Sequence, residues 1–146
     1  MSYQKWFEEH GTKHKVIVNK LTKQGLDKKQ IIDYFDFENM VKMENDFCPL
    51  YAENKKCHDM KTLNCYLCAC PNFRFNDAGF EKQEDKTLFS YCDIESKDGK
   101  PGVYGDAIHQ DCSGCGVPHH RNYVEKHFDL DWFKVMGVCD KTDKEA

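Results

Sequence analysis

The stretch "NCYLCACPNF", residues 64–73, places three cysteines within six positions. A second stretch, "DCSGCGVPHH" at 111–120, adds two cysteines and two histidines. Thiols spaced this closely can form a disulfide, serve as a catalytic nucleophile, or bind zinc or an iron–sulfur cluster. Both the fold and the function of the chain depend on which of these chemistries applies.

The number of cysteines and their expected setting favour metal binding over disulfides. The chain has nine cysteines, an odd number that a closed set of disulfides does not accommodate. The opening stretch "MSYQKWFEEHGTKHK" lacks the apolar region of a secretory signal, and the longest apolar run, "VIV", is far too short for a membrane span. We therefore expect a cytoplasmic protein with reduced thiols, for which clustered cysteines are typically metal ligands.

Composition limits the fold and the partners. A length of 146 residues indicates one domain, or a compact domain with a helical extension, and an apolar share of 40% allows only a modest core. The net charge is −4, Arg74 and Arg121 are the only arginines, and there is no basic block. Neither a nucleic acid nor a membrane is therefore a favoured partner, and we expect the partner to be another protein.

The first 45 residues contain no cysteine and predict a helical N-terminal segment, residues 1–45. Two helices are expected to end at Gly11 and Gly25, since glycine favours helix C-termini. The stretch "LDKKQIIDYF" begins with a capping box, Asp27 and the glutamine three residues later. A last short helix over "DFENMVKMEN" would have Asp36 as its N-cap.

Residues 46–146 contain all nine cysteines and little hydrophobic periodicity. The turn-forming stretches "NDAG" and "SKDGKPGVYGD" predict loops, and "TLFSYCDI" predicts a short strand. The stretch "VPHHRNYVEKHFDLDWFKVMG" predicts a single helix with Pro118 in its first turn and an end at Gly137.

A loop-rich region of this kind buries little apolar surface, and in a reducing cell a bound metal can hold it together. The sequence therefore predicts a small metal-stabilised α+β fold. It would be a loop-rich, zinc-finger-like domain over residues 46–146, preceded by the helical segment.

Two C-x2-C pairs, Cys65/Cys68 and Cys112/Cys115, are the strongest metal signal. Two residues between the cysteines allow a tight turn that directs both sulfurs to one ion, and two such pairs make a tetrahedral four-sulfur zinc site. The segment between the pairs is longer than in the usual zinc finger, so the spacing leaves open which pairs share a metal.

The remaining thiols would complete a second site, giving eight thiols for two four-coordinate ions. Cys70 shares a face with Cys68 in an extended chain and points elsewhere in a turn, so its site stays open. His119 is the best additional ligand and His58 the second. The predicted metal ligands are Cys48, Cys57, Cys65, Cys68, Cys70, Cys92, Cys112, Cys115 and His119.

The other candidates receive ordinary structural interpretations. Cys139 is expected to be a plain thiol. His10 and His14 are expected on an exposed helix face. The sequence predicts structural or surface positions for three more histidines: His109, His120 and His127.

Zinc, as one or two ions, is the expected cofactor, and an iron–sulfur cluster is the alternative. The Cys70-Pro71 dipeptide resembles the end of the ferredoxin ligand run, although the spacing of the preceding cysteines differs. Thiolate ligation suits either metal, so ligand softness does not separate them.

By these motifs the chain resembles the cysteine-rich small domain of bacteria and archaea, a zinc-finger-like family. The resemblance rests on "KCHD", "LNCYLCACPNF", a later lone cysteine and "DCSGCGVPH". It implies metal binding rather than a reaction. The resemblance implies that Cys48 matches a cysteine before the Cys-His pair. It also implies metal ligation by the other predicted ligands: Cys57, Cys65, Cys68, Cys70, Cys92, Cys112, Cys115 and His119. The chain departs from the family in having "DIES" after Cys92 and an insertion over residues 76–108.

The expected function is that of a zinc-stabilised accessory or interaction module. Four aromatic residues would either face its partner or, as is commoner for such residues, lie in the core: Tyr66, Phe73, Phe75 and Tyr104. The alternative is an iron–sulfur protein for electron transfer or redox sensing. Catalysis is not expected, because thiols dominate and neither H-E-x-x-H nor a deaminase signature is present.

Overall fold

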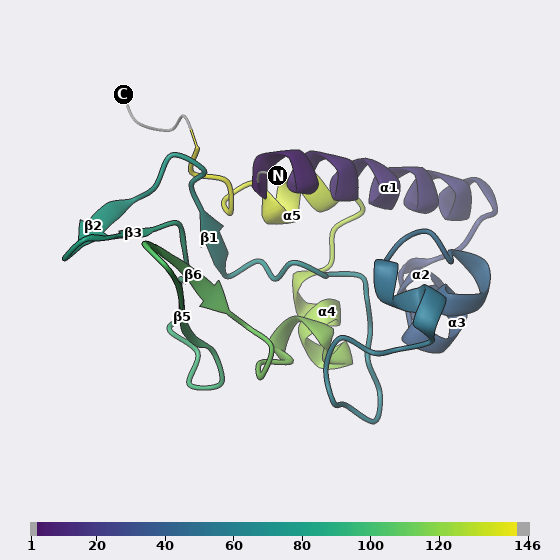
Figure 1. Ribbon diagram of the computed structural model, residues 1–146. Helices are drawn as coiled ribbons and strands as arrows, with labels where there is room; N and C mark the ends of the chain where they lie inside the picture. The colour runs from purple at the N-terminus through teal and green to yellow at the C-terminus, as the bar shows by residue number, and fades with distance from the viewer. Residues whose placement is uncertain (1–2, 143–146) are drawn as a thin grey trace.

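The computed structural model describes residues 3–142 as an α+β fold with helices at one end and strands at the other (Figure 1). The helical elements are α1 (Tyr3–Lys23), α2 (Lys28–Tyr34), α3 (Phe37–Met43), η1 (Pro49–Glu53), η2 (Val117–His119), α4 (Arg121–His127) and α5 (Trp132–Met136). No helix within this part of the chain is long and apolar enough to cross a membrane.

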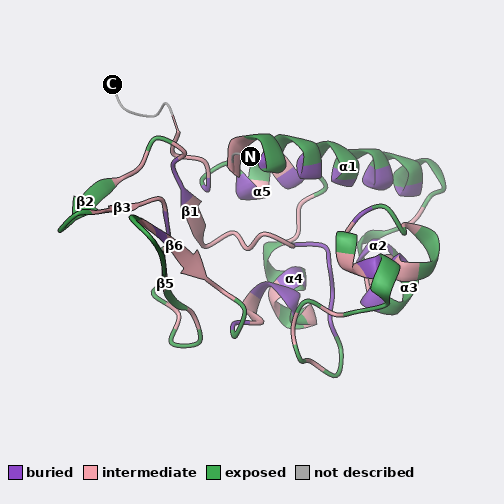
Figure 2. Ribbon diagram, in the orientation of Figure 1, coloured by how far each residue is buried: buried purple, intermediate pink, exposed green. Residues whose placement is uncertain are grey.

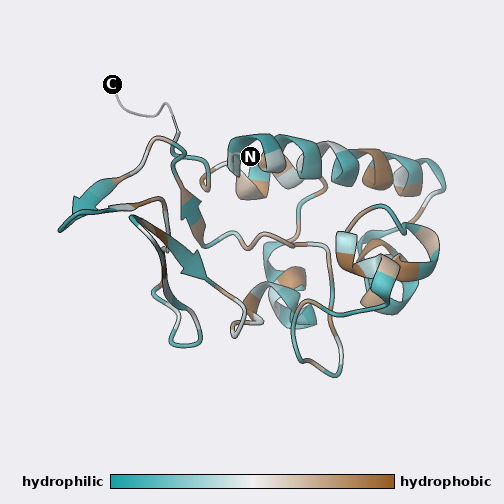
Figure 3. Ribbon diagram, in the orientation of Figure 1, coloured by the Kyte–Doolittle hydropathy of each residue, from teal (hydrophilic) through white to brown (hydrophobic). Residues whose placement is uncertain are grey.

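Two small sheets complete the fold. Strands β1 (Phe73–Phe75) and β4 (Ser90–Cys92) pair antiparallel. A four-stranded sheet has the order β2-β3-β6-β5, in which β3 and β6 are parallel. Its strands are β2 (Glu81–Gln83), β3 (Lys86–Leu88), β5 (Lys100–Tyr104) and β6 (Ala107–Asp111). Figure 3 shows β2 and β6 as mostly hydrophilic, so this sheet adds little to the core.

The core lies between α1 and the elements packed beneath it. Figure 2 shows one face of α1 buried and the opposite face exposed, as expected for an amphipathic helix. Fully buried core residues come from both ends of the chain, among them Leu21, Ile31, Phe35, Tyr66 and Trp132. The division into residues 1–45 and 46–146 stays a prediction, and the core draws on both parts.

The predicted end of a helix at Gly11 is wrong, because α1 continues from Tyr3 to Lys23. Gly11 is buried, and a Cβ atom placed on it would lie 2.2 Å from Cζ of Phe133 in α5. Glycine is therefore needed here for close packing of α5 against α1, and not as a helix stop. The predicted end at Gly25 is correct within two residues, and Gly25 has the left-handed φ of +81°.

This packing predicts how Gly11→Ala changes the free energy of unfolding in two backgrounds. Gly11→Ala should lower the free energy of unfolding by about 1–3 kcal/mol, because the methyl group meets the Phe133 ring. In a Phe133→Ala background the same change should raise it by up to about 1 kcal/mol, since alanine favours the helix. Urea unfolding of the four proteins measures both effects. A stabilising Gly11→Ala in the parent chain would contradict the packing.

The capping box at α2 is confirmed. The Asp27 side chain accepts a hydrogen bond from the Gln30 backbone N–H, and the Gln30 side chain accepts one from Asp27 N–H, both 2.9 Å. Asp36 is the N-cap of α3 as predicted, but its side chain does not cap the helix. Instead its Oδ1 accepts a hydrogen bond of 2.9 Å from Nδ2 of Asn64.

The single helix predicted for residues 117–137 is wrong. The chain forms η2, α4 and α5, with breaks at His120 and between His127 and Trp132. Asp131 causes the second break, because its side chain accepts a hydrogen bond from the Phe133 N–H and so starts α5 as an N-cap. The predicted end at Gly137 is correct.

Two loop and strand predictions also need correction. The stretch "SKDGKPGVYGD" contains β5, and Gly105 with its φ of +65° makes the turn into β6. The stretch "TLFSYCDI" forms the separate strands β3 and β4, with Phe89 between them, and they belong to different sheets. Lys100–Tyr104 pairs with Ala107–Asp111 along its whole length, and that pairing stabilises a stretch whose local sequence favours turns.

His10 and His14 are buried at 6% and 0% exposure, so the prediction of an exposed face is wrong. Both rings pack among aromatic rings, including those of Phe47 and Trp132. Of the four aromatic residues for which surface and core were both open, Tyr66 and Phe75 lie in the core and Tyr104 is exposed.

Candidate metal centre

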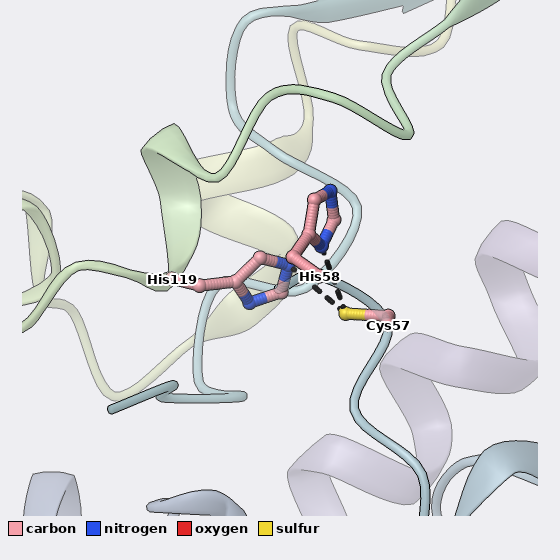
Figure 4. A group of neighbouring side chains, drawn as sticks. All are labelled: Cys57, His58 and His119. Carbon is pink, nitrogen blue, oxygen red and sulfur yellow. Dashed lines mark hydrogen bonds between the residues drawn. The ribbon is translucent and has the colours of Figure 1, made fainter. Parts of the chain in front are cut away.

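Cys57, His58 and His119 bring three potential metal-ligand atoms to within 4.8 Å of one another. Nδ1 of His58 lies 3.0 Å from the Cys57 sulfur, and Nε2 of His119 lies 3.5 Å from it. Figure 4 shows both rings turned toward that sulfur. Cys57 and His58 lie in the loop after η1, and His119 ends η2, so the fold joins residues 62 positions apart.

Backbone carbonyls fix the tautomer of both histidines. Nδ1 of His119 lies 2.9 Å from the Asn64 carbonyl oxygen, and Nε2 of His58 lies 2.9 Å from that of Cys112. A carbonyl only accepts hydrogen bonds, so each of these ring nitrogens carries the proton. The other nitrogen of each ring therefore presents its lone pair to Cys57. A hydrogen bond from the other ring nitrogen to a backbone carbonyl is typical of histidines that bind metals, because it fixes the orientation of the ring.

The electrostatics of the group favour a cation. Burial, more than any other cause, lowers the pKa of His119 to about 4, so its ring is neutral at pH 7 and free to ligate. Burial, followed by the charge of Cys48, raises the pKa of Cys57 to about 11. In the absence of a metal, two nitrogen lone pairs therefore face a single thiol proton. A dication in place of that proton would satisfy all three atoms and stabilise the thiolate.

Asn64 is a site residue that the sequence analysis missed. Its backbone N–H donates to the His119 carbonyl at 3.0 Å, while its own carbonyl accepts from the His119 ring. Its buried side chain donates to the Ile32 carbonyl at 2.7 Å and accepts from the Tyr66 N–H at 3.0 Å. Asn64 thus ties His119 to α2 and to the first C-x2-C turn. Its position directly before Cys65 was the available signal.

Six cysteines line a cavity of about 540 Å³ next to this group, together with the two histidines. The six are Cys57, Cys68, Cys70, Cys92, Cys112 and Cys115. Cys48 occupies the N-cap position of η1 without a side-chain capping bond, Cys65 is buried, and neither is part of the lining. His109, expected at a structural or surface position, also lines the cavity, and its Nδ1 lies 2.5 Å from the Tyr3 hydroxyl oxygen.

Each C-x2-C pair forms the predicted tight turn. The Cys68 N–H donates to the Cys65 carbonyl at 3.3 Å, and the Cys115 N–H donates to the Cys112 carbonyl at 2.9 Å. All nine cysteines are free thiols. Within residues 3–142, the Cys57, His58 and His119 group is the one cluster whose ligand atoms lie within 4.8 Å of one another. Metal ligation by the other predicted thiols stays a prediction.

Cys139 and the two remaining histidines lie apart from this group. The Cys139 thiol is buried and donates to the carbonyl of Cys70 at 3.6 Å. His120 and His127 are exposed, which agrees with the surface positions expected for them.

Comparison with known proteins gave no relative: no family model, no curated protein and no solved structure matches the chain.

Proposed function

We propose that the chain binds a structural zinc ion at Cys57, His58 and His119 and serves as a zinc-stabilised interaction module. The observation that carries the proposal is the pair of fixed tautomers. Each histidine donates its protonated nitrogen to a backbone carbonyl and presents the other to the Cys57 sulfur. Hydrogen bonding of this kind supports histidine ligation, since it orients the ring and raises its basicity.

Cys68 is the proposed fourth ligand. It lines the same cavity as the other three residues, and it closes the turn from Cys65, directly after Asn64, whose carbonyl binds the His119 ring. Four protein ligands of the Cys2His2 type make a closed tetrahedral zinc site, which stabilises structure and leaves no position for substrate. The two imidazoles also favour zinc over an iron–sulfur cluster, because most iron–sulfur clusters are held by thiolates alone.

The proposed partner is another protein. Of the four aromatic residues expected on the surface, Tyr104 is 62% exposed, and its neighbour Val103 is 57% exposed. Both lie on the edge strand β5, which is hydrogen-bonded on one side only, to β6. These two exposed apolar side chains at the open edge of the sheet support a contact with a partner protein there.

The zinc site predicts a contrast between adjacent histidines. His119→Gln should lower the zinc content of the purified, untagged protein by about one ion per chain, because glutamine keeps the polarity and loses the ligating nitrogen. His120→Gln is the matched control, since His120 is exposed and next in sequence, and it should leave the content unchanged. Elemental analysis by mass spectrometry measures both. Equal zinc in the two variants would exclude His119 as a ligand.

A further inference from the structure

The backbone separates Cys68 from Cys70. Ala69 and Cys70 both have left-handed φ values, +93° and +60°, which are unfavourable for residues with a Cβ atom. An extended chain would place the two thiols on one face. The two left-handed residues form a kink, so Cys68 and Cys70 do not share a face here. Cys68 closes the turn that starts at Cys65, whereas the Cys70 carbonyl accepts from the Phe73 N–H at 3.0 Å and so starts the next turn. Backbone strain of this kind persists where the surrounding structure requires it, often at functional sites.

The chain beyond the kink carries Cys70 toward Cys92. Phe73 pairs directly with Cys92 in the β1–β4 ladder. The Asp93 N–H donates to the Asn72 carbonyl at 2.8 Å, which extends the contact back toward Cys70. The turn containing Cys70 and the end of β4 therefore lie side by side.

The loop after β4 then reaches the second C-x2-C turn. The Ser96 hydroxyl lies 3.2 Å from the Cys115 sulfur. A Cβ atom on Gly114 would lie 3.0 Å from the Asp98 carbonyl oxygen, so the backbone of this loop packs closely against the turn. The loop that begins after Cys92 therefore packs against the turn that contains Cys115.

Cys112 belongs to the same turn, because the Cys115 N–H donates to the Cys112 carbonyl at 2.9 Å. These contacts therefore lead from Cys70 to Cys92 and from the loop after Cys92 to the turn of Cys112 and Cys115.

Cys68 stays on the other side of the kink, in the turn that starts at Cys65. The left-handed residues Ala69 and Cys70 therefore separate the pair Cys65/Cys68 from Cys70, Cys92, Cys112 and Cys115.

We propose that Cys70, Cys92, Cys112 and Cys115 form a second zinc site, separate from the site at Cys57. The inference rests on the proposed zinc-binding function and assigns its ligands. All four thiols line one cavity, and four thiolates make a closed tetrahedral site. No three of these sulfurs lie within 4.8 Å of one another. Zinc binding therefore requires the loops that carry the four thiols to move closer, which couples binding to folding.

His58 connects the two sites. Its Nδ1 faces Cys57, and its Nε2 donates to the Cys112 carbonyl. Zinc at one site therefore orients a residue that touches the backbone of the other. Cys139 belongs to neither site, because its thiol donates to the carbonyls of Cys70 and Pro71 and does not line the cavity.

Zinc counts in three single variants of the full chain test this assignment. The parent protein should hold about two zinc ions, and Cys92→Ser and Cys57→Ser about one each. Cys139→Ser is the matched control and should keep both ions. One ion in the parent that either Cys92→Ser or Cys57→Ser removes completely would overturn the second site and leave the proposed function standing. A parent protein without zinc would overturn the proposed function itself.

Alkylation of the unaltered protein tests the same point if a variant fails to fold. In zinc-loaded protein the four thiols of the second site should resist iodoacetamide, and limited chelation should release them as a set, at a different chelator concentration from Cys57. Peptide mass spectrometry identifies the modified residues. Release of Cys70 together with Cys57 and Cys68, ahead of Cys112, would contradict the proposed grouping.

Discussion

Chelation of the bound zinc is expected to unfold the loops that carry the cysteines. These segments, residues 54–72 and 93–120, are irregular outside β5, β6 and η2, and the apolar core takes only four of their residues: Leu63, Cys65, Tyr66 and Leu67. Structural zinc contributes about 10–16 kcal/mol of apparent binding free energy in small finger peptides, so its loss should abolish the ordered state of these segments. Hydrogen exchange measured peptide by peptide should show amide protection falling by orders of magnitude there.

The helical part should respond differently. The contacts among α1, α2, α3 and α5 involve buried apolar side chains such as Leu21, Ile32 and Met40, so the far-ultraviolet circular dichroism should change little. Added zinc should restore protection, whereas magnesium, which prefers oxygen ligands, should not. Unchanged exchange in residues 54–72 after complete removal of metal would contradict a structural role.

Acid is expected to destabilise the fold through the two buried histidines of α1. Burial lowers the pKa of His10 to about 4 and that of His14 to about 3, far below the usual value of 6.5. The charge of Lys13 adds to the shift at His10, and that of His10 adds to the shift at His14. The Tyr66 carbonyl oxygen lies 3.0 Å from His14 Nε2 and opposes the shift there. The other surroundings are aromatic: the rings of Trp6, Phe35, Phe47, Tyr66 and Trp132.

The direction of the pH effect on stability follows from the pH range in which the unfolded and the folded chain bind protons. The unfolded chain protonates these rings below pH 6.5, whereas the folded chain does so only near pH 4 and below. Their contribution to stability is therefore complete above pH 6.5 and is lost as the pH falls toward 4. The fall of the His10 pKa from 6.5 to about 4 corresponds to roughly 3 kcal/mol.

A variant comparison separates this effect from acid release of zinc. His10→Phe preserves the aromatic packing and removes the unpaired Nε2, so its free energy of unfolding should fall less between pH 7 and pH 5 than that of the parent. His127→Gln, at an exposed position, should keep the parental slope. Urea unfolding at matched zinc concentration gives both slopes. Parallel slopes for His10→Phe and the parent would exclude His10 as the cause.

Local sequence signals predicted local structure well. The capping box at Asp27, the end of α5 at Gly137 and the two C-x2-C turns each depend on residues a few positions apart, and each is present. Gly11 shows where such signals fail. Its role depends on Phe133, a residue more than a hundred positions away, and no local pattern reveals that contact.

The candidate site shows the same limit. Residue types and spacing identified Cys57 and His119 as candidate ligands and His58 as a secondary one. Spacing could not show that Asn64 and Cys112 would offer the carbonyls that fix the two tautomers, because those contacts join loops 54 and 55 residues apart. For the same reason the sequence left Cys70 open, since its placement depends on the kink at Ala69 and on pairing with β4.

The measurement that tests the central claim most directly is the metal content of the untagged full chain purified without oxygen. Zinc bound at Cys57, His58 and His119 predicts colourless protein with at least about one zinc ion per chain and no iron or labile sulfide. Brown protein that contains iron and sulfide in place of zinc would contradict the account, and so would folded protein without any metal.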